Sequence, residues 1–282
     1  MLNDLRPPAN YPKYPPYHEG GYLEEYFYNW WKSKNIITER EYIDIFWTNI
    51  YCNSGDSIHS KLYIQKYLDS LDFRKKYFTV CQHDNGPLEH LPPDTKIFSA
   101  GGNRTFGNII PIPLICSKIK ETNIDKPRDI LCSFIGSETH PIRNSIYETW
   151  KDDEDFHISY KKWSFNVSNN DFLNFKNVTE RSIFSLCPRG YGLSSFRLYE
   201  SIQLGAIPVY ISDKYYLPWT DELDWNEFCV MITPDNIKNL KSILLTYEKD
   251  DIKRMSTLAR ELYRKYFSLD GLCEQILKRI ND

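Results

Sequence analysis

Short apolar runs alternate with helical patterns along most of the chain, and this alternation constrains the fold more than any other feature. Parallel strands need a crossover between them, usually a helix, so strands that alternate with helices indicate parallel βαβ units. The sequence therefore predicts an α/β protein with helices on both faces of parallel sheets. The expected strands are 42–51, 77–81, 95–100, 108–115, 130–136, 156–160, 182–187, 206–211 and 228–233, and the expected helices are 21–34, 58–73, 140–151, 194–204 and 237–280.

A polar segment that contains a proline, residues 121–129, separates two sets of alternating elements. We therefore predict two Rossmann-like domains that face each other, one at residues 1–125 and one at residues 126–282 that includes the terminal helices. A single doubly wound sheet is the structural alternative.

Charge and cysteine usage exclude several classes of protein. The net charge of -3 gives no basic excess of the kind that nucleic-acid binding needs. The 7 cysteines form no CxxC pair, so we expect free thiols in a reducing, cytoplasmic compartment. The proline-rich start lacks the apolar core of a signal peptide, and no run is long enough to span a membrane, so we expect a soluble protein.

The segment from Cys187 to Asp213 has the features of a diphosphate site. Gly190 allows close backbone approach after a strand, and Ser194 or Ser195 can cap the helix that follows. The N-terminus of that helix offers free N–H groups to a phosphate, and Arg197 adds positive charge. Glu200 lies about 7.5 Å further along the axis, within reach of a ribose. An ordinary helix with a surface arginine and glutamate explains the same spacing equally well.

The same segment resembles the signature of the exostosin family of glycosyltransferases. The match continues through "LDW" at 223–225, upstream through Gly136 and Arg143, and through a His-Asp-x-Gly segment that begins at His83, where Asn85 replaces a common tryptophan. The matching residues of the signature are Pro188, Gly190, Ser194, Arg197, Glu200, Gly205, Ile207, Pro208, Val209 and Asp213.

The resemblance implies a GT-B fold, in which the first domain binds the acceptor and the second binds a nucleotide sugar. It implies a UDP-sugar donor, a glycan or glycoprotein acceptor, inversion at the anomeric carbon, and no obligatory metal. Xylose is the first choice of sugar, because the trimmed chain resembles compact exostosin-like xylosyltransferases of large algal viruses; such a protein would work in the host cytoplasm. Arg143 would join Arg197 and the 194–195 turn at the diphosphate. A non-catalytic sugar- or nucleotide-binding module is the rival class.

Direct displacement needs a base that deprotonates the acceptor hydroxyl. Asp84 follows a predicted strand, so it would face the cleft, and His83 beside it is an alternative base or a positioning group. Asp84 could instead only cap its turn. His18 with Glu19 is a weaker pair, and Arg104 reads as an ordinary loop arginine.

No cluster of residues has convincing metal-ligand spacing. Asp153 and Asp155 form a D-x-D sequence, but they lie in a charged run before a strand, which is typical of a solvated turn. We therefore predict that neither a metal nor a cofactor is required. A nicotinamide-dependent enzyme is disfavoured, because no G-x-G-x-x-G follows the first strand.

Overall fold

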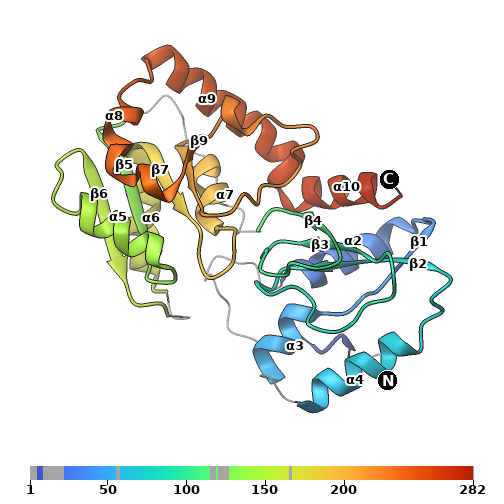
Figure 1. Ribbon diagram of the computed structural model, residues 1–282. Coiled ribbons are helices and arrows are strands. Elements are labelled where there is room, and N and C mark those ends of the chain that lie inside the picture. The colour runs from blue at the N-terminus through green and yellow to red at the C-terminus, as the bar shows by residue number, and fades with distance from the viewer. Residues whose placement is uncertain are drawn as a thin grey trace.

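The computed structural model describes residues 5–8, 22–54, 58–114, 119, 127–164 and 167–281. It contains two parallel sheets, each with its own helices (Figure 1). The predicted α/β class with two sheets is thus confirmed, and a single continuous sheet is excluded. The division at residue 125 stays a prediction, and most of the proposed linker lies outside the described residues.

The first sheet has four strands that lie side by side in chain order. Loops 82–95 and 100–107, which the structure describes throughout, join the last three strands without a helix. The strands are β1 (Arg40–Tyr42), β2 (Lys76–Cys81), β3 (Lys96–Ser99) and β4 (Asn108–Pro111), and the helices are α2 (Leu23–Lys34), α3 (Trp47–Ser54) and α4 (Ile58–Asp69).

Strand β2 shows why this sheet needs cover on both faces. Successive side chains of a strand point to opposite faces, and Phe78 and Val80 pack in a core with α2, whereas Tyr77 and Cys81 pack in another with α3 and α4. All four are almost fully buried. The continuous apolar run "YFTVC" is therefore typical of a strand buried on both sides.

The second sheet has the order β6-β5-β7-β8-β9. Helix α5 connects β5 to β6 on one side of it, and α6 then leads back across β5 to β7 on the other side. Helix α7 continues in that second direction to β8. The direction of strand order therefore reverses between β5 and β7. The strands are β5 (Ile130–Ser137), β6 (Phe156–Lys161), β7 (Ser182–Pro188), β8 (Ile207–Ile211) and β9 (Val230–Ile232), and the helices are α5 (Pro141–Trp150), α6 (Asn169–Arg181) and α7 (Phe196–Gln203).

Two local expectations were wrong. Residues 42–51 are not one strand: β1 ends at Tyr42, and α3 begins at Trp47, where the backbone N–H of Thr48 donates to the buried Glu24 carboxylate. Helix α6 was missed, although Ser168 and Asp171 form the reciprocal capping box that marks a helix start.

The chain returns to the first half at its end. After the 3-10 helices η1 (Trp225–Glu227) and η2 (Pro234–Asn239) come α8 (Leu240–Leu244), α9 (Lys249–Leu262), a π-helical turn η3 (Tyr263–Phe267) and α10 (Leu269–Arg279). Helix α10 lies against α2 beside the first sheet (Figure 1). Leu272 and Ile276 belong to the same core as Phe27 and Phe78, and that core continues to Leu198 in α7. The two halves therefore share one apolar core.

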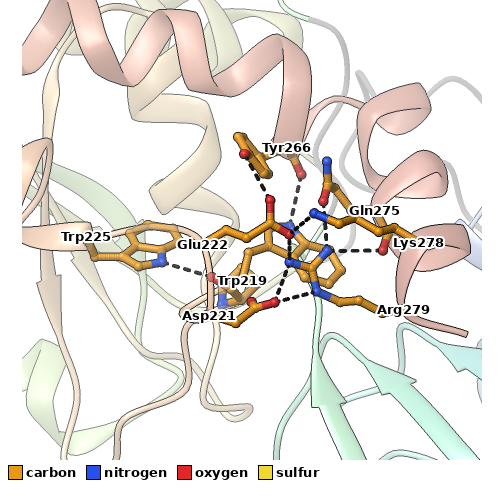
Figure 2. A network of polar contacts seen from close by, with 9 residues as sticks. Trp219, Asp221, Glu222, Trp225, Tyr266, Gln275, Lys278 and Arg279 are labelled. Carbon is orange, nitrogen blue, oxygen red and sulfur yellow. Dashed lines mark hydrogen bonds and ion pairs between the residues drawn. The ribbon is translucent and has the colours of Figure 1, made fainter. Parts of the chain in front are cut away.

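A network of polar contacts fastens α10 to the segment after β8 (Figure 2). The guanidinium group of Arg279 is buried, pairs with Asp221 and Glu222, and lies 4.5 Å from the ring centroid of Trp219. Trp219 has a φ of 59°, which is unfavourable for a bulky residue. The Arg279 carbonyl accepts from Nζ of Lys96 in β3 at 2.9 Å. This network joins both halves at the C-terminus.

Among the described residues, no helix is long and apolar enough to cross a bilayer. Six cysteines are described and all six are free thiols, five of them buried, while Cys116 lies outside the described part of the chain. The reducing compartment stays a prediction.

We expect Arg279→Met to lower the free energy of unfolding by about 1.5–3 kcal/mol, because it removes buried hydrogen bonds to charged groups. Lys278→Met is the matched control: Lys278 also pairs with Glu222, at 2.8 Å, but its side chain is 59% exposed. Its loss should cost less than about 1 kcal/mol. Urea denaturation measures the free energy of unfolding of both variants. Equal losses would show that the buried Arg279 network does not stabilise the junction more than the exposed Lys278 pair does.

Candidate functional site

A cavity of about 530 Å³ lies where the two halves meet. Asp84 and Leu114 line it from the first half, and the loops after β5 and β7 line it from the second. These loops flank the point at which the strand order reverses. In open α/β sheets, ligands bind outside the carboxyl ends of the strands at such a switch point. The cavity is therefore the place where this topology favours a ligand.

Most of the predicted site residues lie in this cavity. Gly136, which the sequence resemblance singled out, also lines it, whereas His83 and Glu200 are not among its lining residues. The predicted residues that line the cavity are Asp84, Arg143, Gly190, Ser194, Ser195 and Arg197.

Helix α7 begins at the cavity wall. Ser195 is its N-cap residue, with extended backbone angles, but its hydroxyl makes no capping hydrogen bond. Ser194 and Ser195 are both buried. The first N–H groups of a helix have no intrahelical acceptor and carry a partial positive charge. The start of α7 therefore has the geometry and partial charge that favour an anion.

Arg143 forms part of the cavity floor. Its guanidinium group is buried and donates to the backbone carbonyls of Arg189 at 2.9 Å, Ser137 at 3.1 Å and Pro188 at 3.1 Å. Arg143 therefore fixes the loops after β5 and β7 to each other. Its charge lies beneath the turn at Gly190: a Cβ added at Gly190 would lie 3.4 Å from the Arg143 Nη2 atom.

Arg197 and Glu200 form an ion pair within α7. Arg197 also donates from Nε to the carbonyl of Ile135 at 2.7 Å and lies 4.0 Å from the ring centroid of Phe175. Glu200 is fully buried. The predicted phosphate-binding arginine thus lines the cavity, whereas the predicted ribose-binding carboxylate does not.

Asp84 is the carboxylate that the first half presents to the cavity. Its loop follows β2, and its carbonyl accepts from the N–H of Asn103 at 3.0 Å. Burial raises the pKa of Asp84 to about 6, and the positive charges of Arg143 and Arg189 oppose that rise. A partly buried carboxyl group with a pKa near neutrality suits proton transfer.

The turn at 190–193 lies directly against the Asp84 loop. The N–H of Leu193 donates to the Gly101 carbonyl at 2.7 Å, and Nδ2 of Asn103 donates to the Tyr191 carbonyl at 3.2 Å. A Cβ at Gly192 would lie 2.3 Å from Oδ1 of Asp84. Glycine is therefore required at 192 by the close approach of the two halves.

His83 lies away from the cavity. Its Nδ1 accepts from the N–H of Asn85 at 3.3 Å, and its ring packs edge-on against Tyr51 at 4.9 Å between centroids. These contacts suit a residue that holds the loop rather than one that reaches a ligand.

Thr139 was missed by the sequence analysis. Thr139 lines the cavity, and its Oγ1 is buried and has no hydrogen-bond partner among the described residues. A buried unpaired hydroxyl is costly unless a ligand pairs with it. The signal that could have found it was its place just after β5, at the switch point.

Three lesser candidates have structural settings of their own. Arg104 is buried and donates to the carbonyls of Pro87 and Phe106, so the interpretation as a loop arginine is confirmed. Asp153 and Asp155 both pair with Lys241 of α8, at the amino end of β6 and thus at the edge opposite the cavity. His18 and Glu19 lie outside the described residues.

We expect Gly192→Ala to lower the free energy of unfolding by about 2–3 kcal/mol, because overpacking costs roughly this much. Gly190→Ala is the control: its Cβ would meet its nearest atom at 3.3 Å, and neither glycine has a positive φ. Thermal unfolding of the two variants tests this prediction. Equal melting temperatures would contradict the close approach of Gly192 to the Asp84 loop.

Comparisons with known proteins identify relatives. The chain is 30% identical over 176 residues to a probable glycosyltransferase of Arabidopsis thaliana, which covers 62% of this chain and 33% of the relative. It is 26% identical over 140 residues to an exostosin-1 homolog of Caenorhabditis elegans, which covers 49% of this chain and 34% of the relative. The chain thus spans about a third of the length of these relatives.

Among solved structures, the pneumococcal O-GlcNAc transferase GtfA in complex with UDP and GlcNAc aligns with 88% of this chain and 49% of its own. The sequence identity is 14% and the TM-score is 0.42, which is too low to carry an argument about the site. The GT-B arrangement rests on the two parallel sheets that face the cavity.

The Exostosin GT47 domain matches residues 97–246, which are 150 of the 282 residues. This span runs from β3 through α8 and includes the loops after β5 and β7, and so most of the cavity lining. The chain belongs to the exostosin GT47 family.

Proposed function

We propose that this protein is an inverting glycosyltransferase that moves a sugar from a UDP-sugar to a hydroxyl of a glycan acceptor. One observation carries the proposal: a carboxylate from the first half and the start of α7 from the second line the same cavity. Xylose is the first donor to test. The rival proposal is a binding module that holds the nucleotide sugar without turning it over.

The donor diphosphate would lie against the start of α7. The N–H groups of the helix start, the Thr139 hydroxyl and the charges of Arg143 and Arg197 all favour an anion there. Glu200 holds Arg197 in place and would contact the ribose directly only after Arg197 turned away.

The positive charge of the arginines would stabilise the leaving UDP without a divalent cation. Asp153 and Asp155, the acidic pair that could otherwise hold one, both pair with Lys241 at the far edge of the sheet. We therefore propose turnover that EDTA does not abolish.

In the proposed reaction, the acceptor oxygen attacks the anomeric carbon from the side opposite the diphosphate. Asp84 takes the proton of that hydroxyl as the new glycosidic bond forms. The bond between the anomeric carbon and the phosphate oxygen breaks, and UDP leaves with the bonding electrons. One displacement inverts the anomeric configuration.

A donor panel tests the function. The purified chain is incubated with UDP-xylose, UDP-glucuronic acid, UDP-galactose and UDP-N-acetylglucosamine, with and without candidate glycans and with and without EDTA. Mass spectrometry detects the transferred sugar, and NMR gives its anomeric configuration. UDP binding with no turnover in any reaction would favour the binding module, and retention of configuration would reject the mechanism.

Asp84→Asn should lower transfer by a factor of roughly 10²–10⁴, the usual contribution of a positioned base. In the unmodified enzyme, Asp84 must be ionised to act. Because its pKa is about 6, kcat/KM should fall tenfold for each pH unit below 6 and level off above it. His83→Ala should have the smaller effect. Near-normal transfer by the Asp84→Asn enzyme would move the base elsewhere.

Thr139→Val should weaken UDP binding by roughly 10- to 100-fold, because a hydrogen bond to a charged group contributes about 1.5–3 kcal/mol. The protein itself should not be destabilised, since the hydroxyl has no described partner. Thr149→Val is the control: this exposed α5 hydroxyl donates to the Ser145 carbonyl at 2.7 Å. Calorimetric titration with UDP measures both, and equal affinities would remove Thr139 from the site.

A further inference from the structure

The first turn of α2 buries a carboxylate against the strand end that leads to Asp84. Oε1 of Glu24 accepts from the N–H of Gln82 at 3.1 Å, and from the N–H and Oγ1 of Thr48 at 3.1 and 2.7 Å. In the other direction, the side-chain oxygen Oε1 of Gln82 accepts from the N–H of Leu23 at 2.9 Å. Helix α2 and Gln82 are thus joined by hydrogen bonds in both directions.

The arrangement is costly for stability alone. Glu24 is fully buried, and its Oε2 has no hydrogen-bond partner among the described residues. Burial and the neighbouring charge of Glu25 raise the pKa of Glu24 to about 7, while the bonds from Thr48 and Gln82 oppose the rise. A buried carboxyl group with one oxygen left without a hydrogen bond lowers the stability of the fold, so stability alone does not explain the presence of Glu24 here.

Gln82 lies two residues before Asp84, and the opposite side of this segment is already fixed. The carbonyl of Cys81 accepts from the N–H of Ala100, and the carbonyl of Asp84 accepts from the N–H of Asn103, both at 3.0 Å. Glu24 supplies the support on the remaining side. Residues 81–84 are therefore held between α2 and the loop after β3.

We propose that Glu24 is a positioning residue, which holds the Gln82–Asp84 segment so that the Asp84 carboxylate meets the acceptor hydroxyl. The proposal rests on the proposed role of Asp84 as the base. The close contact with Gly192 makes the position of Asp84 sensitive to small shifts, and a misplacement of about 1 Å can cost 10²-fold in rate.

The test compares Glu24→Ala with Glu24→Gln, using the donor and acceptor pair that turns over in the panel. Glu24→Ala removes the acceptor oxygen, so we expect kcat to fall by roughly 10- to 10²-fold. UDP affinity by calorimetry should stay unchanged, because the donor contacts lie in the other half. Glu24→Gln keeps a carbonyl oxygen at the same place and should restore most of kcat.

Two controls separate positioning from general damage. Thr79→Val removes two buried hydrogen bonds of β2, with Trp47 and with the Ile43 carbonyl, but none that involves Gln82. It should lower stability with little effect on kcat. In the Asp84→Asn background, Glu24→Ala should cause no further loss of transfer, since residues that act as one unit are not additive.

The pH profile excludes a direct role for Glu24. The acid limb of kcat/KM should keep its midpoint near 6 in Glu24→Gln, because Asp84 and not Glu24 takes the proton. If that limb disappeared, Glu24 itself would be the base, and the proposal would be wrong.

If Glu24→Ala does not fold, the Gln82→Met variant tests the positioning role instead. It removes only the bond from Leu23 and keeps the Gln82 N–H, so we expect a smaller fall in kcat, again with unchanged UDP affinity. Unchanged kcat in Gln82→Met, or equal losses in Glu24→Ala and Thr79→Val, would overturn the positioning role. Normal transfer by Asp84→Asn would instead show that the proposed base, and not only this inference, is wrong.

Discussion

The arrangement of the cavity depends on the contact between a glycine turn in one half and the Asp84 loop in the other. A backbone hydrogen bond from Leu193 to Gly101 makes this contact, together with a bond from the Asn103 side chain to the Tyr191 carbonyl. The turn that touches Asp84 also leads into α7, so the carboxylate and the helix start have a fixed separation. In the proposed reaction these two groups act on one substrate, and holding reacting groups at a fixed separation is the basis of catalysis by orientation.

The shared core explains how this contact can persist. Interfaces between domains of one chain are often polar, and relative motion is then expected. Here the apolar core continues from α2 and the first sheet into α7, and α10 closes it from the far end of the chain. The buried Arg279 network adds oriented ionic contacts at the same junction (Figure 2). A wide opening of the cavity would expose this core, so large hinge motion is disfavoured.

The sequence predicted the parts of the structure that depend on local patterns. The strand, glycine turn and helix around Gly190 follow from residue spacing, and Asp84 was placed at a strand end by the same reasoning. The predicted strand 42–51 was wrong because apolar residues such as Ile45 and Trp47 suit a strand or a helix. A hydrogen bond from the Thr48 N–H to Glu24, which is distant in the sequence, favours the helix. The pairing of Glu200 with Arg197 could not be foreseen either, since i,i+3 spacing fits both an ion pair and two separate ligand contacts.

The arginine side chains around the cavity are each held in one position by their hydrogen-bonding partners. Arg189 is held by an ion pair with Asp213, and Arg197 by an ion pair with Glu200. Arg143 is oriented by three backbone carbonyl oxygens, those of Arg189, Ser137 and Pro188. Such fixed charges need no reorganisation when a ligand arrives, and this makes them effective in a partly buried site.

The same charge acts on Asp84. Burial alone pushes the pKa of this carboxyl group upward, and Arg143 is the largest influence that opposes the rise. Without Arg143 a larger fraction of Asp84 would be protonated at neutral pH and unable to accept a proton. In the proposed reaction, Arg143 would attract the anionic donor and also keep the proposed base ionised, so electrostatics as well as the backbone contact would couple the two halves of the site.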